Sequence, residues 1–226
     1  MRVLAIDTAL AACSAAVLDT ERGGIVASES QPMLRGHAEA LMPLLQRVLA
    51  ESGVTPTEMD RIAVTTGPGS FTGLRVGIAA ARGIALAAGR PAVGLSTLSV
   101  YAAPHMAADD RVPVIAAIDA RHGHVYLQVF SPGGRTFTVP RLAPLREAIE
   151  AAAETPSCIV GSAAELVAAG LADGHGPATV DPRPAPDIAW VARMGAVVPE
   201  DQSPPAPLYL RAPDAQPQYA AQLPRR

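Results

Sequence analysis

Two short stretches of this sequence hold residues that could bind a phosphate group or another anion. In the first, Asp7 and Thr8 end a predicted buried strand, where a carboxylate and a hydroxyl can hold a phosphate or its metal ion. A hairpin backbone that closes on phosphates needs glycine there, because a Cβ atom blocks the approach. Residues 7–14 contain no glycine. We therefore favour the alternative in which Asp7 and Thr8 bond the amides of their own turn.

The second stretch is a glycine-rich loop at 67–75. Gly67, Gly69 and Ser70 place backbone amides before the start of a predicted helix, and such amides can bind an anion. The lysine of a phosphate-binding loop is missing. A tight turn that seats the helix against a sheet explains the same residues equally well, so the sequence leaves both interpretations open.

The other nucleophiles and metal ligands form no catalytic set. All 18 basic residues are arginine, which excludes lysine general bases and lysine Schiff bases. Three histidines stand alone, at His37, His105 and His175, and the other two flank a turn glycine at 123. No pair has the i,i+4 spacing of zinc peptidases. We interpret Cys13 and Cys158 as buried small hydrophobic residues.

Hydrophobic patterning predicts the elements that position these residues. We expect strands at 3–7, 14–18, 25–30, 61–66, 114–119, 124–130 and 158–161. We expect helices at 36–52, from the glycine-rich loop to about 88, at 163–169 and at 187–197, with a short one opening at Thr55.

The two halves of the chain repeat one order of elements. Ala5-Ile6-Asp7 and Ala117-Ile118-Asp119 end corresponding strands, and a second strand and a strand-to-helix turn follow each. The sequence therefore predicts an α/β protein of two actin-like or ribonuclease-H-like subdomains, each a mixed sheet flanked by helices. We place the subdomains at 1–105 and 106–212, and expect a flexible tail at 213–226.

Two predicted helices are unusually rich in small and apolar residues. In the helix after the glycine-rich loop, narrow stripes of glycine and alanine permit another helix to come close, and little polar surface remains. We expect this helix and that at 36–52 to dock on another protein. The expected contact residues are His37, Leu41, Leu45, Gly73, Arg75, Gly77, Ala80, Ala81 and Ile84. The alternative is complete burial of both helices within this chain.

Composition limits the partners. The formal net charge is −3, so a dominant electrostatic grip on a nucleic-acid backbone is not expected. We find no stretch of about 18 uninterrupted apolar residues, and Asp7 interrupts the N-terminal apolar segment. We therefore expect a cytoplasmic protein that does not contact membranes.

Several motifs together resemble the TsaB-type subunits of bacterial tRNA threonylcarbamoyladenosine biosynthesis. In chain order they are residues 4–8 with Cys13-Ser14, Gly36-His-Ala-Glu39 with Leu41-Met-Pro43, Thr66-Gly-Pro-Gly-Ser-Phe-Thr-Gly-Leu-Arg75 with Gly77, Ile118-Asp-Ala-Arg121 with Val125-Tyr126, and Pro207-Leu-Tyr-Leu-Arg211. The resemblance covers the chain to about residue 211.

The resemblance implies an accessory subunit without catalytic residues, metal or cofactor. Such subunits bind a larger catalytic TsaD-type paralogue through two helices, which match residues 36–52 and 73–88. The paralogue carries a metal-binding HxxxH pair and modifies the adenosine next to the anticodon in tRNAs that read codons beginning with A. An ATPase subunit of the TsaE type joins the complex. The resemblance further implies indirect contact with tRNA and self-pairing when the partner is absent.

Two rival functions remain at the level of sequence. One is an actin-like phosphotransferase or ATPase that uses Asp7, Asp119 and the loop at 67–73. The absence of lysine and of hairpin glycines argues against it, although weak ATP or ADP binding is compatible with the residues at Asp7, Thr8, Gly67, Gly69 and Ser70. The other rival, a metallopeptidase, would require a histidine pair that this sequence lacks.

Overall fold

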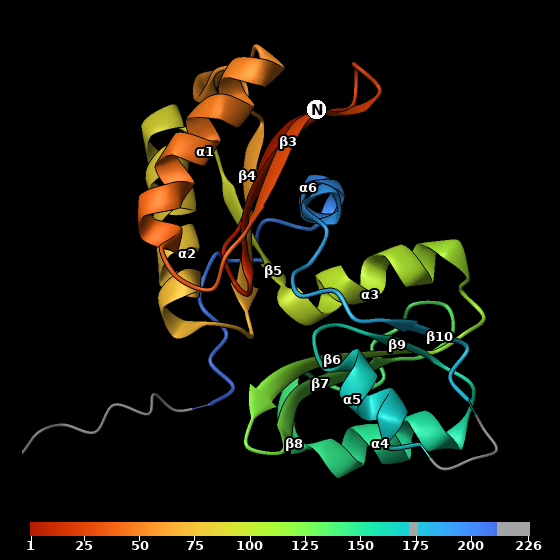
Figure 1. The fold of residues 1–226 in the computed structure, drawn as a ribbon. Coiled ribbons are helices and arrows are strands. Elements are labelled where there is room, and N and C mark those ends of the chain that lie inside the picture. The colour runs from red at the N-terminus through yellow and green to blue at the C-terminus, as the bar shows by residue number, and fades with distance from the viewer. Residues whose placement is uncertain (172–175, 212–226) are drawn as a thin grey trace, which may run out of the picture.

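The protein folds into two five-stranded sheets, each flanked by helices (Figure 1). A computed structural model describes residues 1–171 and 176–211. His175 and the expected tail at 213–226 lie outside the described residues. The expected subdomain boundary at 105/106 falls inside a helix, α3.

The first sheet contains the strands β1 (Arg2–Asp7), β2 (Ala12–Asp19), β3 (Gly24–Pro32), β4 (Arg61–Gly67) and β5 (Ala92–Ser96). The second contains β6 (Val114–Arg121), β7 (His124–Phe130), β8 (Arg141–Pro144), β9 (Cys158–Val160) and β10 (Thr179–Asp181). The helices are α1 (His37–Ser52), α2 (Phe71–Ala88), α3 (Thr97–Ala108), α4 (Leu145–Glu154), α5 (Ala164–Ala169) and α6 (Ile188–Val197), with a 3₁₀ turn, η1, at Pro56–Glu58.

The two sheets have the same topology, which confirms the predicted repeat. The strand order is β3-β2-β1-β4-β5 in one and β8-β7-β6-β9-β10 in the other. In each sheet the first three strands are antiparallel and the last two join in parallel. Gly67 is the last residue of β4 and Gly161 directly follows the equivalent strand β9, with φ values of 111° and 104°. Both turns therefore use a conformation that side chains other than glycine rarely adopt.

Each sheet is covered on both faces. Figure 1 shows α1 and α2 on one side of the first sheet and α6 on the other, while α3 and the pair α4 and α5 cover opposite faces of the second sheet. The helices α3 and α6 also contact each other. Helix α3 follows β5 of the first sheet along the chain but packs on the second sheet, and α6 follows β10 of the second sheet but packs on the first. This exchange of helices ties the two halves together.

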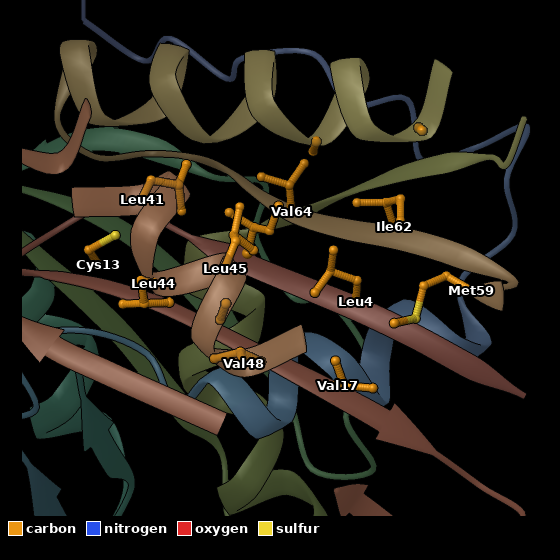
Figure 2. Packing of buried hydrophobic residues seen from close by; sticks show 14 of the residues in the cluster. Leu4, Cys13, Val17, Leu41, Leu44, Leu45, Val48, Met59, Ile62 and Val64 are labelled. Atoms are coloured by element: carbon orange, nitrogen blue, oxygen red, sulfur yellow. The ribbon is translucent and has the colours of Figure 1, made fainter. Parts of the chain in front are cut away.

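The largest apolar cluster lies between the first sheet and the helices α1 and α2. Figure 2 shows Leu41, Leu44, Leu45 and Val48 of α1 pointing onto Leu4, Val17 and Val64 of the strands. At about 25 cal/mol per Å² of apolar surface removed from water, this burial holds both helices firmly on the sheet. These helices form because their apolar residues recur every three or four positions, and Gly53 and Gly89 end them in left-handed conformations.

Candidate docking face and the cleft between the subdomains

The inward side of α1 contains three of the expected contact residues. Leu41 and Leu45 are buried in the cluster of Figure 2. His37 is also buried, and its Nε2 atom lies 3.0 Å from the carbonyl oxygen of Leu10. These residues hold α1 on its own sheet and are not available to a second protein.

Three small residues of α2 likewise face the chain's own strands. A Cβ atom on Gly73 would stand 2.1 Å from the Thr8 carbonyl oxygen, and one on Gly77 would stand 2.4 Å from the Thr8 hydroxyl. Ala81, one turn further, is fully buried. The stripe of Gly73, Gly77 and Ala81 therefore permits close contact between α2 and the β1–β2 hairpin, within one chain.

The opposite side of α2 is exposed. Phe71, Arg75, Ala79, Arg82 and Leu86 recur at spacings of three and four and are all exposed, with Leu86 at 85%. Of the expected contact residues, Arg75 belongs to this stripe, and Ala80 and Ile84 are half-buried beside it. We call seven of the exposed residues of both helices and of the loop before α1 the docking face: Leu34, Met42, Phe71, Arg75, Ala79, Arg82 and Leu86.

The docking face is apolar for a surface. Leu34 is 84% exposed and Met42 51%. By length and mean hydropathy, 1.3 over 18 residues, α2 reaches the range of a membrane span, and 33% of it is buried inside the protein. One such helix is weak evidence for a membrane. Its buried stripe packs on the sheet of a globular fold. A helix that packs one side on its own sheet and also exposes large apolar side chains on its outer side is typical of a protein–protein interface.

The residues expected for an anion site lie close together, but their polar groups bond neighbouring groups of the same subdomain. The Asp7 carboxylate is fully buried, and its Oδ1 atom accepts hydrogen bonds from the Ala9 amide (3.1 Å) and the Thr65 hydroxyl. Burial raises the pKa of this carboxyl. The Thr8 hydroxyl donates to the Gly73 carbonyl oxygen at 2.7 Å. The bond between Asp7 and the Ala9 amide matches the interpretation in which Asp7 stabilises its own turn. Thr8 differs from that expectation, since its hydroxyl bonds the first turn of α2 and not an amide of its own turn.

The glycine-rich loop packs against the same hairpin. The Ser70 amide donates to the Ala9 carbonyl oxygen at 2.7 Å, and the Ser70 hydroxyl accepts from the Gly73 amide at 3.3 Å, which caps α2. A Cβ atom on Gly69 would stand 2.3 Å from the Ala9 carbonyl oxygen. A Cβ atom on Gly67 would stand 3.0 Å from the Leu208 carbonyl oxygen. The loop thus seats α2 on the sheet.

A cleft of about 730 Å³ separates the two subdomains at the ends of these strands. Gly69, Ser70 and Phe71 line one side, and Asp119 and Arg121 line the other. Asp119 is exposed, unlike its counterpart Asp7, and accepts a hydrogen bond from the Arg121 amide at 2.8 Å. Asp7 itself is not part of the lining, so the two equivalent aspartates do not face each other across the cleft.

The C-terminal part of the described chain crosses this cleft, a role that the sequence did not indicate. The Leu208 amide donates to the Thr66 carbonyl oxygen at 2.8 Å. Tyr209 packs on Phe71 with ring centroids 5.1 Å apart and accepts a hydrogen bond from Arg75 at 3.1 Å. Arg211 donates to the Ala120 carbonyl oxygen at 3.2 Å. Residues 208–211 therefore connect the start of α2 to the second subdomain.

Within the described ranges, no group of three or more histidine, cysteine, aspartate or glutamate side chains is arranged to hold a metal ion. The sequence itself contains no HxxxH pair.

Known proteins match both the sequence and this architecture. Residues 11–159 match the family described as "TsaD: tRNA N6-adenosine threonylcarbamoyltransferase". The chain is 43% identical over 126 residues to the tRNA threonylcarbamoyladenosine biosynthesis protein TsaB of Escherichia coli, a match that covers 56% of this chain and 53% of that protein. It thus spans about half the length of the first curated relatives that it matches.

Two further relatives match over nearly their whole length. The uncharacterized protein Rv3421c of Mycobacterium tuberculosis is 32% identical over 218 residues, 95% of this chain and 94% of that protein. The solved structure of YeaZ from Pseudomonas aeruginosa superposes with a TM-score of 0.75 at 28% identity, over 92% of this chain and 99% of that one. The matched range, the sequence identity and the shared fold together place the chain in the TsaD family, as a protein of the TsaB type.

Proposed function

We propose that this protein is a non-catalytic accessory subunit in the synthesis of threonylcarbamoyladenosine in tRNA. In this proposal it supports transfer of the threonylcarbamoyl group by binding a catalytic TsaD-type paralogue. The curated TsaB relatives support the assignment to this pathway, and the match to the TsaD family supports a partner of that type.

The observation that carries the proposal is the two-sided character of α2. Its inner stripe is fully engaged by the chain's own hairpin, through Gly73, Gly77 and Ala81. Its outer stripe nonetheless exposes a large apolar side chain at each end of the helix, Phe71 and Leu86. Fully burying one leucine side chain is worth about 1.5–3 kcal/mol. The paralogue therefore gains most of its affinity by covering the outer stripe and the neighbouring side of α1.

The non-catalytic part of the proposal has separate support. The Asp7 Oδ1 atom and the hydroxyls of Thr8 and Ser70 are occupied by hydrogen bonds within the first subdomain, whereas the buried Asp7 Oδ2 atom has no hydrogen-bond partner among the described residues. In a working phosphate site such groups would face the ligand. We propose accordingly that the protein needs no metal or nucleotide of its own, and that any binding of ATP or ADP is weak.

The remaining partners follow from the same surface. An apolar face that is left uncovered tends to pair with itself, so we expect the isolated chain to form a homodimer through the docking face. An ATPase subunit of the TsaE type would join the assembled pair. Contact with tRNA would be indirect, since a chain of net charge −3 has a weak electrostatic attraction for the tRNA backbone. The expected compartment is the cytoplasm.

The direct test is reconstitution of tRNA modification from purified subunits. With the catalytic paralogue and ATPase subunit present, omission of this chain should abolish repeated turnover, measured as threonylcarbamoyladenosine in digested tRNA. The chain alone should modify no tRNA. Full modification in its absence, or modification by this chain alone, would contradict the proposal.

A further inference from the structure

Three side chains from distant parts of the sequence meet on the second subdomain. Cys158 begins β9, His105 lies in the last turn of α3, and Asp181 ends β10. The Cys158 Sγ atom lies 3.4 Å from His105 Nδ1, and the other ring nitrogen, Nε2, lies 3.0 Å from Asp181 Oδ2. None of these residues belongs to the docking face or lines the cleft between the subdomains.

The carboxylate determines which ring nitrogen can accept a proton. An ionised carboxylate only accepts hydrogen bonds, so His105 Nε2 must carry a hydrogen. In the neutral ring Nδ1 then has a free lone pair, and the Cys158 thiol is the group that donates to it. The imidazole is thereby held in the tautomer that can remove a proton from the thiol.

The Asp181 carboxylate is itself fixed. The Arg183 Nε atom lies 3.0 Å from Asp181 Oδ1 and 2.9 Å from Oδ2. The Tyr101 hydroxyl of α3 donates to the Arg183 carbonyl oxygen at 2.9 Å, which ties this segment to the same helix that carries His105. The order thiol, imidazole, carboxylate, guanidinium is that of an activated nucleophile with its supporting groups.

Cys158 needs a base because of its surroundings. Burial raises the pKa of its thiol, and the negative charges of Asp181 and Asp109 act in the same direction, although a hydrogen bond with Thr179 opposes them. The resting group at neutral pH is therefore the thiol, and reaction requires that its proton be removed as the sulfur attacks. Cys158 keeps 9% of its surface exposed, compared with 0% for Cys13.

We propose that Cys158 is a peroxide-reactive thiol, with His105 as its general base and Asp181 as the positioning residue. In the reaction, the sulfur attacks one oxygen of a hydroperoxide while its proton passes to His105 Nδ1. The S–O bond forms and the O–O bond breaks. The leaving oxygen takes the proton from the imidazolium, so the products are a sulfenic acid and water or an alcohol. Sulfur is oxidised by two electrons and the peroxide is reduced.

The chain contains its own reference thiol. Cys13 is fully buried in the apolar cluster under α1, and burial raises its pKa to about 11. Exposure alone would make Cys158 react somewhat faster than Cys13. Activation by His105 predicts in addition that the rate of oxidation of Cys158 depends on the side chains of His105 and Asp181.

The test is hydrogen peroxide oxidation of the folded full chain, with dimedone to trap sulfenic acid and mass spectrometry to measure the label at each cysteine. We expect Cys158 to be labelled at least about tenfold faster than Cys13, a difference that disappears in urea. His105→Gln and Asp181→Asn should each slow labelling of Cys158 about tenfold or more, within the range of general-base effects. Asp181→Glu should restore part of the rate, which a purely structural role of Asp181 would not predict.

Asp109→Asn is the matched control, because the charge of the Asp109 carboxylate acts on Cys158 while that carboxylate bonds Arg111. The backbone amide of Asp109 donates to the His105 carbonyl oxygen at 3.0 Å, a bond that the substitution retains. The substitution should not slow the reaction. Circular dichroism verifies that each variant is folded. Asp181→Asn keeps the size of the side chain, so it remains informative if His105→Gln does not fold. The proposal is overturned if Cys158 is not labelled, or if folded His105→Gln or Asp181→Asn protein reacts at the wild-type rate.

Discussion

Gly73 and Thr8 approach each other so closely that a Cβ atom on Gly73 would stand 2.1 Å from the Thr8 carbonyl oxygen. Gly73→Ala must therefore displace the backbone of α2 or of the β1–β2 hairpin. We expect a loss of about 1–3 kcal/mol in the free energy of unfolding, the usual range for overpacking. Urea denaturation of the purified protein measures it.

Gly83 provides the matched control in the same helix. A Cβ atom there would meet nothing within 4 Å. Since glycine inside a helix costs about 1 kcal/mol relative to alanine, Gly83→Ala should stabilise the protein by up to that amount. If both variants changed stability equally, close contact at Thr8 would not be the reason for glycine at position 73.

Asp7 should make stability depend on pH in an unusual direction. Burial raises the pKa of this carboxyl in the folded protein above its unfolded value. As pH rises through the interval between the two values, the unfolded chain releases this proton first, so the contribution of Asp7 to stability falls. Asp7→Asn retains the oxygen that accepts from the Ala9 amide and the Thr65 hydroxyl.

The measurement is the free energy of unfolding of the wild type and of Asp7→Asn as a function of pH. The range runs from about pH 4, near the ordinary pKa of a carboxyl group, to about pH 8. We expect the variant to gain stability relative to the wild type as pH rises. Subtracting the two curves removes the opposite contribution of Asp19 and Glu58, whose pKa values are lowered by hydrogen bonds from Arg2 and Thr55. A difference that is constant with pH would show that Asp7 titrates normally.

ATP provides a test of the rival function. Because Asp7 Oδ1 and the Thr8 and Ser70 hydroxyls are engaged by Ala9 and Gly73 of the same subdomain, calorimetric titration with ATP and Mg²⁺ should give little or no heat of binding, and phosphate release should equal that of a buffer blank. Tight binding with hydrolysis that is lost in Asp119→Ala and Asp7→Asn would instead identify an actin-like ATPase.

The sequence predicted the first subdomain better than the second. The helices α1 and α2 have clear helical periods and glycine stops, and the capping pattern at Thr55 is present, with Glu58 accepting from the Thr55 amide at 2.8 Å. The elements β5, α3, β8, α4 and β10 were not predicted. In α3 the residues at 97, 98 and 100–103 are all buried, so the helix has no amphipathic period to detect.

The sequence pattern identified two helices that carry exposed apolar side chains, but the expected contact residues were a mixed set of buried and exposed positions. The helical period of apolar residues in a sequence shows that a helix has distinct sides. Only the packing in the structure shows which of these sides is covered by the helix's own sheet. Leu41, Leu45, Gly73, Gly77 and Ala81 therefore face inward, whereas the exposed Leu86 and Met42 were not among the expected contacts. Sequence reasoning also missed the link of Cys158 with His105 and Asp181, because 53 and 76 positions separate His105 from the other two.

The central claim is that the outer side of α2 binds the catalytic paralogue, and Leu86→Glu tests it. Leu86 is 85% exposed, so the change should leave the monomer folded, while covering a carboxylate in an apolar interface is costly. We expect affinity for the paralogue, measured by calorimetry, to fall about 10- to 100-fold, in line with the loss of one buried leucine. The matched control is Leu166→Glu on α5, an exposed leucine of the second subdomain, 48% exposed, which should bind as the wild type does. Unchanged affinity of Leu86→Glu, or an equal loss in both variants, would contradict the account.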